Sequence, residues 1–177
     1  MIRRPKSVMR KAQTTVLIVG EGDTEKAFLD HLKALYVTRG CGVSITIRNA
    51  HGKGPDNVVD VAIRYARGAA YTIVAAFMDT DLPWSPELRK LARSKKICLI
   101  GASPCCDGLL LQILGEHIPM ESSKCKAKLL TRLGKKPVAV EAYQHDFSKA
   151  LLDDRRGIIA TLDKLLSLMA GARPDAD

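Results

Sequence analysis

Short apolar runs alternate with amphipathic segments along most of the chain. The runs are rich in β-branched residues or alternate with polar residues, as strands do, and they lie at residues 14–19, 42–48, 71–78 and 96–100. Elsewhere apolar side chains recur at helical spacing, which predicts helices at residues 24–37, 56–68, 84–94, 107–114, 122–133 and 148–169. This order predicts an α/β fold, with a mainly parallel sheet between helices.

The length of 177 residues fits one folded domain. We expect that domain to span residues 14–170, with a basic flexible arm at 1–13 and a flexible tail at 171–177. No apolar stretch approaches the ~20 residues that cross a bilayer, and the N-terminus lacks the apolar core of a signal peptide. We therefore expect a cytoplasmic protein without a membrane partner.

Five cysteines are present, an odd number without the paired spacing of a zinc site. Several lie in or beside apolar runs, so we expect reduced and mostly buried thiols.

The net charge of +9 is unevenly distributed. Residues 1–13, 89–96 and 124–136 concentrate Lys and Arg and contain no Asp or Glu, whereas the rest of the chain is net acidic. Such segregation favours a polyanionic partner, because Lys and Arg neutralise phosphates; a solvated surface is the alternative. The candidate nucleic-acid-binding residues are Arg89, Lys90, Arg93, Lys95, Lys96, Lys124, Lys126 and Lys128.

Carboxylates follow two of the predicted strands. Glu21 comes after the first strand, and Asp79 and Asp81 come after the third. Ligand sites of open parallel sheets lie beyond the carboxyl ends of the strands, where these acids could converge. Close carboxylates repel one another unless a cation intervenes, and oxygen ligands suit Mg²⁺ or Mn²⁺. Ordinary loop and capping carboxylates are the alternative.

Other phosphate-binding motifs do not fit. The segment 20–25 has Glu where a dinucleotide fingerprint requires its third Gly, and residues 52–54 lack the spacing of a P-loop. A haloacid-dehalogenase phosphatase would carry its Asp-x-Asp after the first strand rather than the third.

Two motifs together resemble a known family. The run V-L-I-V-G-E-G-D-T-E at 16–25 and D-T-D at 79–81 are similar to the Toprim domain of primases, topoisomerases and OLD-type nucleases. RloB-like proteins, small Toprim-type proteins of bacterial defence loci, also carry an S-N-P-C-F-E-x-W-L-L-like element, which A-S-P-C-C-D-G-L-L at 102–110 resembles. Here Cys106 replaces Phe, Asp107 replaces Glu, and Gly108 precedes the leucines. The similarity covers roughly residues 14–116.

The resemblance implies a three-layer, Rossmann-like Toprim fold that cleaves phosphodiesters with Mg²⁺ or Mn²⁺. Glu21 would act as general acid/base or metal-linked group, Asp79 and Asp81 would hold the metal, and Asp107 could join them. Glu25, four residues after Glu21, and Lys53, in a loop at the same predicted sheet edge, are further catalytic candidates. Glu25 favouring the helix dipole, and Lys53 being a plain turn residue, are their alternatives.

The leading functional hypothesis is therefore a metal-dependent nuclease, an antiphage defence effector that works with a partner ATPase. The alternative is a nucleic-acid-binding or partner-docking module with a degenerate Toprim site; a nucleotide phosphohydrolase is a third. The sequence leaves open DNA or RNA as substrate, endo- or exonuclease action, activity without a partner, and homo-oligomer formation.

Two conspicuous residues favour structural roles. His31 falls on the apolar face of the helix predicted at 24–37, where a buried histidine is expected. Trp84 follows the acidic pair, where packing over the sheet edge is expected and stacking on a base is the alternative.

Overall fold

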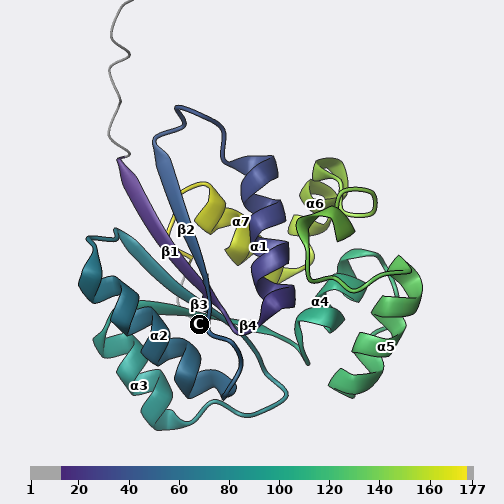
Figure 1. Ribbon diagram of the computed structural model, residues 1–177, viewed down its shortest axis with the longest axis horizontal. Coiled ribbons are helices and arrows are strands. Elements are labelled where there is room, and N and C mark those ends of the chain that lie inside the picture. The colour runs from purple at the N-terminus through teal and green to yellow at the C-terminus, as the bar shows by residue number, and fades with distance from the viewer. Residues whose placement is uncertain (1–12, 175–177) are drawn as a thin grey trace, which may run out of the picture.

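Four parallel strands form one sheet in the order β2-β1-β3-β4. Figure 1 shows this sheet between two groups of helices in the computed structural model, which describes residues 13–174. The strands are β1 (Thr14–Gly20), β2 (Val43–Asn49), β3 (Ile73–Asp79) and β4 (Ile97–Ala102). All four predicted strands are confirmed, with ends shifted by one or two residues.

The burial of each strand follows its sequence. The apolar runs of β1 and β3 occupy the centre of the sheet, where helices cover both faces. The alternating strand β2 lies at one edge, with Ile45 and Ile47 buried and Ser44 and Arg48 exposed. Strand β4 forms the other edge.

Helices cover the two faces unequally (Figure 1). On one face, the side chains of Leu17 and Val19 pack with α2 (Gly54–Gly68) and α3 (Pro86–Ser94). On the other, those of Val16 and Ile18 belong to a larger core with the remaining helices: α1 (Asp23–Tyr36), α4 (Cys106–Ile113), α5 (Ser122–Leu133), α6 (Lys149–Arg156) and α7 (Ala160–Met169). The α/β class with a parallel sheet is thus confirmed. None of the helices within residues 13–174 has the length and apolar character of a membrane span.

The single helix predicted at 148–169 is wrong, because the chain breaks between α6 and α7. Gly157, whose lack of a side chain disfavours helix, follows the last residue of α6. Ile159 is extended and buried before α7 begins. Across the break, Arg156 donates to Asp163 Oδ1 (2.5 Å) and to Ser167 Oγ (3.2 Å).

The segment between α5 and α6 supplies an aromatic cluster that the sequence pattern did not predict. It contains a short 3-10 helix, η1 (Val140–Ala142), followed by the buried Tyr143 and Phe147. Both rings contact Phe28 of α1. His31 is buried, lies against the Tyr143 ring and is hydrogen-bonded through Nε2 to the Phe147 carbonyl (2.8 Å), which confirms its structural role.

The C-terminal segment has a defined position as far as Pro174. Arg173 donates to the Lys96 carbonyl beside β4 (2.9 Å), and Pro174 is buried. Residues 171–174, which we assigned to a flexible tail, therefore lie against the body of the protein. The basic arm, apart from Gln13, and residues 175–177 lie outside the described residues.

Candidate functional site

Glu21 and Asp79 meet at the carboxyl edge of the sheet. Strands β1 and β3 are paired with Gly20 opposite Phe77, so their carboxyl ends lie side by side. The Glu21 amide donates to the Phe77 carbonyl (3.2 Å), and the Asp79 amide donates to Glu21 Oε2 (3.2 Å). The structure therefore brings together the two acids that follow the central strands.

Glu25 lies beside this pair, in the first turn of α1. Its side chain is buried, and its Oε2 accepts a hydrogen bond from the Gly22 amide (2.8 Å). Gly20 permits the close approach of α1 to β1, because a Cβ at that position would lie 2.8 Å from Glu25 Cβ. The glycine between strand and helix thus places a third carboxylate at the same edge.

Burial and mutual repulsion make this group of carboxylates hard to ionise. The pKa of Asp79 is raised to about 8, first by burial and then by the charge of Glu25, although the Cys106 amide donates to its Oδ1 (2.8 Å) and opposes the rise. Burial likewise raises the pKa of Glu25, with a smaller contribution from Glu21. A cation at this edge would relieve the repulsion.

The side chain of Asp81 contacts the start of α5, although its charge is among those that raise the pKa of Asp79. Asp81 is exposed, and its Oδ2 accepts a hydrogen bond from the Ser122 hydroxyl at the start of α5 (2.8 Å). Its Oδ1 accepts from the Leu82 amide (2.9 Å). The structure thus places Asp81 as a link to α5 and does not join it to Glu21.

Asp107 lies in the first turn of α4, next to Cys106, whose amide binds Asp79. Its Oδ1 is buried and has no hydrogen-bond partner within residues 13–174. Burial raises its pKa, while the charge of Lys126 on α5 opposes that rise. An unsatisfied buried carboxylate oxygen is costly and is a suitable ligand for a cation.

Lys53 lies in the loop whose backbone contacts Glu21, but its side chain forms no ion pair with the acids described above. The Gly52 amide donates to the Glu21 carbonyl (2.8 Å), so the loop backbone contacts the site. Lys53 itself is exposed, with a left-handed backbone, and its ammonium makes no ion pair in the described part of the chain.

By chemistry, Glu21, Glu25, Asp79 and Asp107 fit a hard divalent ion, since all their donors are carboxylate oxygens. In residues 13–174, however, no three His, Cys, Asp or Glu side chains are already arranged as a metal-binding cluster. The hydrogen bond from the Ser122 hydroxyl to Asp81 explains part of this, because it holds that carboxylate at the start of α5. Binding an ion would require side-chain rotation at this edge.

Sequence reasoning missed the groups that hold these acids. The Cys106 amide, which donates to Asp79, lies in the run at 102–110, but a backbone donor leaves no side-chain signal in the sequence. The Ser122 hydroxyl, which donates to Asp81, lies outside any motif. Gly20 was visible as a glycine between strand and helix, which is the one signal that could have been used.

The cysteines around the site are structural. All five are free; Cys105, Cys106 and Cys125 are buried, Cys98 is half-buried and Cys41 is exposed. Burial raises the pKa of Cys105 to about 12, so it is a thiol at neutral pH. This confirms the prediction of mostly buried thiols.

The basic residues predicted to bind nucleic acid lie on α3, in the turn after it, and on α5, on opposite sides of the sheet (Figure 1). The cations from α3 and its turn are exposed and form no ion pair within the described residues. On α5, Lys124 pairs with Glu121 (2.5 Å) and Lys128 with Glu116 (3.3 Å), whereas Lys126 forms no ion pair there.

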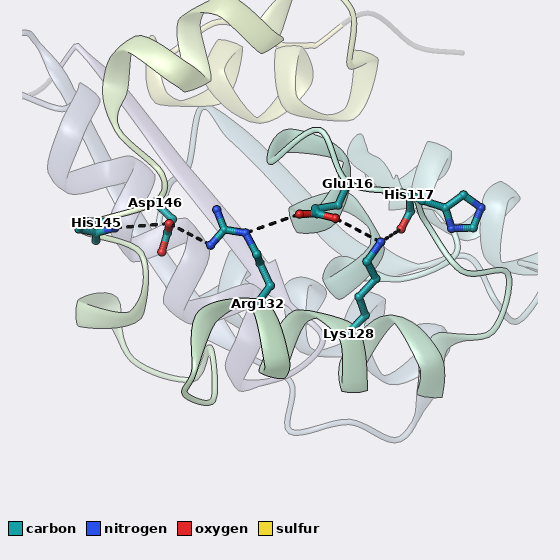
Figure 2. A network of polar contacts seen from close by, with 6 residues as sticks. All are labelled: Glu116, His117, Lys128, Arg132, His145 and Asp146. Carbon is teal, nitrogen blue, oxygen red and sulfur yellow. Dashed lines mark hydrogen bonds and ion pairs between the residues drawn. The ribbon is translucent and has the colours of Figure 1, made fainter.

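Figure 2 shows the polar contacts that Lys128 and Arg132 of α5 make within the protein. Arg132 lies between Glu116 (3.6 Å) and Asp146 (3.4 Å), and Lys128 also donates to the His117 carbonyl (2.8 Å). These contacts hold α5 against the segments before and after it.

Comparisons of the chain with protein-family models, with curated proteins and with solved structures found no significant match.

Proposed function

We propose that this protein is a metal-dependent nuclease that hydrolyses phosphodiester bonds in DNA or RNA. The observation that carries the proposal is the gathering of Glu21, Glu25 and Asp79 at the carboxyl ends of the two central strands. The likeness of residues 16–25 and 79–81 to Toprim motifs supports it, as does the presence of basic helices on both sides of the sheet.

Each acid has a distinct part in this proposal. Glu21 and Asp79, with Asp107, would hold Mg²⁺ or Mn²⁺, and the hydrogen bonds from Asp79 and Cys106 amides orient the first two. The bound ion supplies Lewis-acid stabilisation of charge on the phosphoryl oxygens. Glu25, whose pKa is raised by burial, would hold or move a proton at Oε1, because Oε2 accepts a hydrogen bond from the Gly22 amide. Asp81 would join the ligands only after leaving Ser122.

The test is cleavage of labelled single- and double-stranded DNA and RNA with Mn²⁺, Mg²⁺ or EDTA. We expect metal-dependent cleavage that falls by roughly 100-fold or more in Glu21→Gln and in Asp79→Asn. Asp56→Asn, which changes an exposed acid in the first turn of α2, is the matched control and should keep full activity. Metal-independent cleavage, or full activity of both site variants, would contradict the proposal.

A second candidate is a nucleic-acid-binding or docking module without catalysis. It is favoured by the position of Asp81, which is hydrogen-bonded to α5 rather than placed with Glu21. This candidate predicts binding that weakens steeply with salt and is unaffected by EDTA or by the acid variants.

The proposal extends to antiphage defence with a partner ATPase only through the likeness to RloB-like proteins. Cleavage by the purified chain alone would show that no partner is required; cleavage that appears only when an ATPase and ATP are added would support the partnership.

A further inference from the structure

A basic groove runs along the open edge of β4. Its volume is about 520 Å³, within the range of ligand pockets. Residues 97–99 of β4 line it, together with Trp84, Arg89, Arg93, Lys96 and Arg173. We propose that an unpaired nucleic-acid strand lies in this basic groove, with its phosphates on the arginines and Lys96 and a base stacked on Trp84. The inference rests on the proposed function and adds to it the form of the substrate.

The cations of the basic groove are available to a ligand. Arg89, Arg93 and Lys96 are exposed and form no ion pair in the described part of the chain, and Arg173 donates to a backbone carbonyl. Of the described residues that line the groove, none is acidic. A phosphate backbone would therefore meet several positive charges and, among the described lining residues, no negative one.

Trp84 is held in position before any ligand binds. Its indole Nε1 donates to the Asp79 carbonyl (3.0 Å), and the Arg89 guanidinium lies over its ring at 5.2 Å. Gly101 makes room for the ring, because a Cβ there would lie 3.1 Å from it. A fixed aromatic ring beside guanidinium groups is the usual stacking platform of proteins that bind single strands.

A second hollow of about 440 Å³, the inner hollow, adjoins the basic groove. It shares Trp84 and Arg89 with the groove and is also lined by Thr80 and Gly101. Thr80 stands between Asp79 and Asp81, so the inner hollow borders the loop that carries both acids. A strand that enters along β4 would reach the proposed catalytic edge past Trp84.

An unpaired strand fits these features better than a duplex. Stacking on the Trp84 ring requires an open base face, which a base-paired helix keeps within its own stack. The arginines around the ring would contact the neighbouring phosphates of the same strand. The groove thus matches the alternation of base and phosphate along one strand.

The first experiment uses the intact protein in EDTA, so that no cleavage occurs. Trp84 is the only tryptophan, so its fluorescence reports directly on the platform. We expect oligothymidylate and oligouridylate of roughly 12 nucleotides to quench it on binding, whereas an abasic strand should bind without quenching and a duplex should bind more weakly. The thymidylate and uridylate arms distinguish DNA from RNA.

The second experiment compares variants by fluorescence anisotropy with the same labelled strands. Arg93→Ala should weaken binding roughly 5-fold or more and lower the salt dependence by about one phosphate contact. Arg67→Ala removes the same charge from an exposed residue of α2 that lines neither hollow, and it should change affinity less than about 2-fold. Trp84→Phe should keep most of the affinity, whereas Trp84→Leu should lose about as much as Arg93→Ala.

Unchanged Trp84 fluorescence on saturation, equal affinity for duplex and single strand, or an equal loss in Arg67→Ala and Arg93→Ala would each overturn the inference. Its failure is separable from that of the nuclease proposal. Binding in EDTA without cleavage in Mn²⁺ would support the strand-binding groove and contradict the nuclease proposal. Cleavage that is unaffected by substitution of Arg93 and Trp84 would support the nuclease and contradict the groove.

Discussion

Helices α3 and α5 are both rich in Lys and Arg, yet their charges are used differently. On α5, Arg132 and Lys128 form a network with Glu116, Asp146 and neighbouring backbone (Figure 2). On α3 and in the turn after it, the cations are exposed, form no ion pair among the described residues, and in part line the basic groove.

The difference shows that net charge alone does not identify a binding surface. The cations on one helix can be paired within the fold, whereas a similar run on another helix forms no ion pair among the described residues. The three-dimensional positions of the acids decide between these uses, since Glu116 and Asp146 lie next to α5 and no acid lines the described part of the groove at α3.

The largest expected effect concerns the acids at the carboxyl edge of the sheet. No cation of α3 or α5 is among the main influences on Asp79, whose pKa is raised to about 8 by burial and by other carboxylates. The folded protein therefore binds a proton there that the unfolded chain has released, so stability should fall as pH rises from about 4 to 8. Through this group, the wild type should lose on the order of 3–4 kcal/mol of unfolding free energy between about pH 4 and 7. Asp79→Asn should not show this loss.

Urea unfolding in EDTA across this pH range measures the effect, because the difference between wild type and Asp79→Asn isolates one group. A matched pair of measurements with Mg²⁺ should show stabilisation of the wild type and little of the variant. If the unfolding free energy of the wild type fell with pH no more steeply than that of the variant, nearby cations would be stabilising the charged form of Asp79. The cations of the helices would then not be separated from the acids as described above.

The next effect tests the contrast directly by charge reversal. Arg89→Glu with Arg93→Glu should weaken single-strand binding by roughly 100-fold, since two phosphate contacts become repulsive. Lys124→Glu with Lys126→Glu makes the same change of charge on α5 and should weaken it by less than about 5-fold. Anisotropy titrations at one fixed salt concentration compare the two pairs; equal losses would assign both helices to the nucleic acid.

The smallest effect concerns stability. Arg132→Met breaks the α5 network at its centre, and we expect a loss of about 1 kcal/mol of unfolding free energy, because the network is only partly buried. Lys90→Met on α3 should change stability by less than about 0.5 kcal/mol. Thermal unfolding monitored by circular dichroism checks both, and an unchanged melting temperature in Arg132→Met would show that the α5 contacts are incidental.

The sequence predicted those parts of the site that depend on regular structure. Two apolar runs, each followed by an acid, predicted parallel strands with Glu21 and Asp79 at one edge of the sheet. The pairing of β1 with β3 brings those two residues together. The sequence could not predict the contact made by the Asp81 side chain, because its partner Ser122 belongs to α5, which is distant in sequence. The network of Arg132 depends in the same way on tertiary contacts that leave no local pattern.

The aromatic cluster around Tyr143 connects the last third of the chain to α1 and so limits where the chain can be truncated. Tyr143 donates through its hydroxyl to the carbonyls of Pro137 (2.7 Å) and Thr24 (3.2 Å), and Thr24 precedes Glu25 in the first turn of α1. The core that includes β1 and α1 extends through Leu162 and Met169 of α7. Truncation after residue 116 would therefore remove the part of this core from Cys125 to Met169 and expose the apolar residues that remain. The carboxylate edge and the last helices should unfold in one cooperative transition.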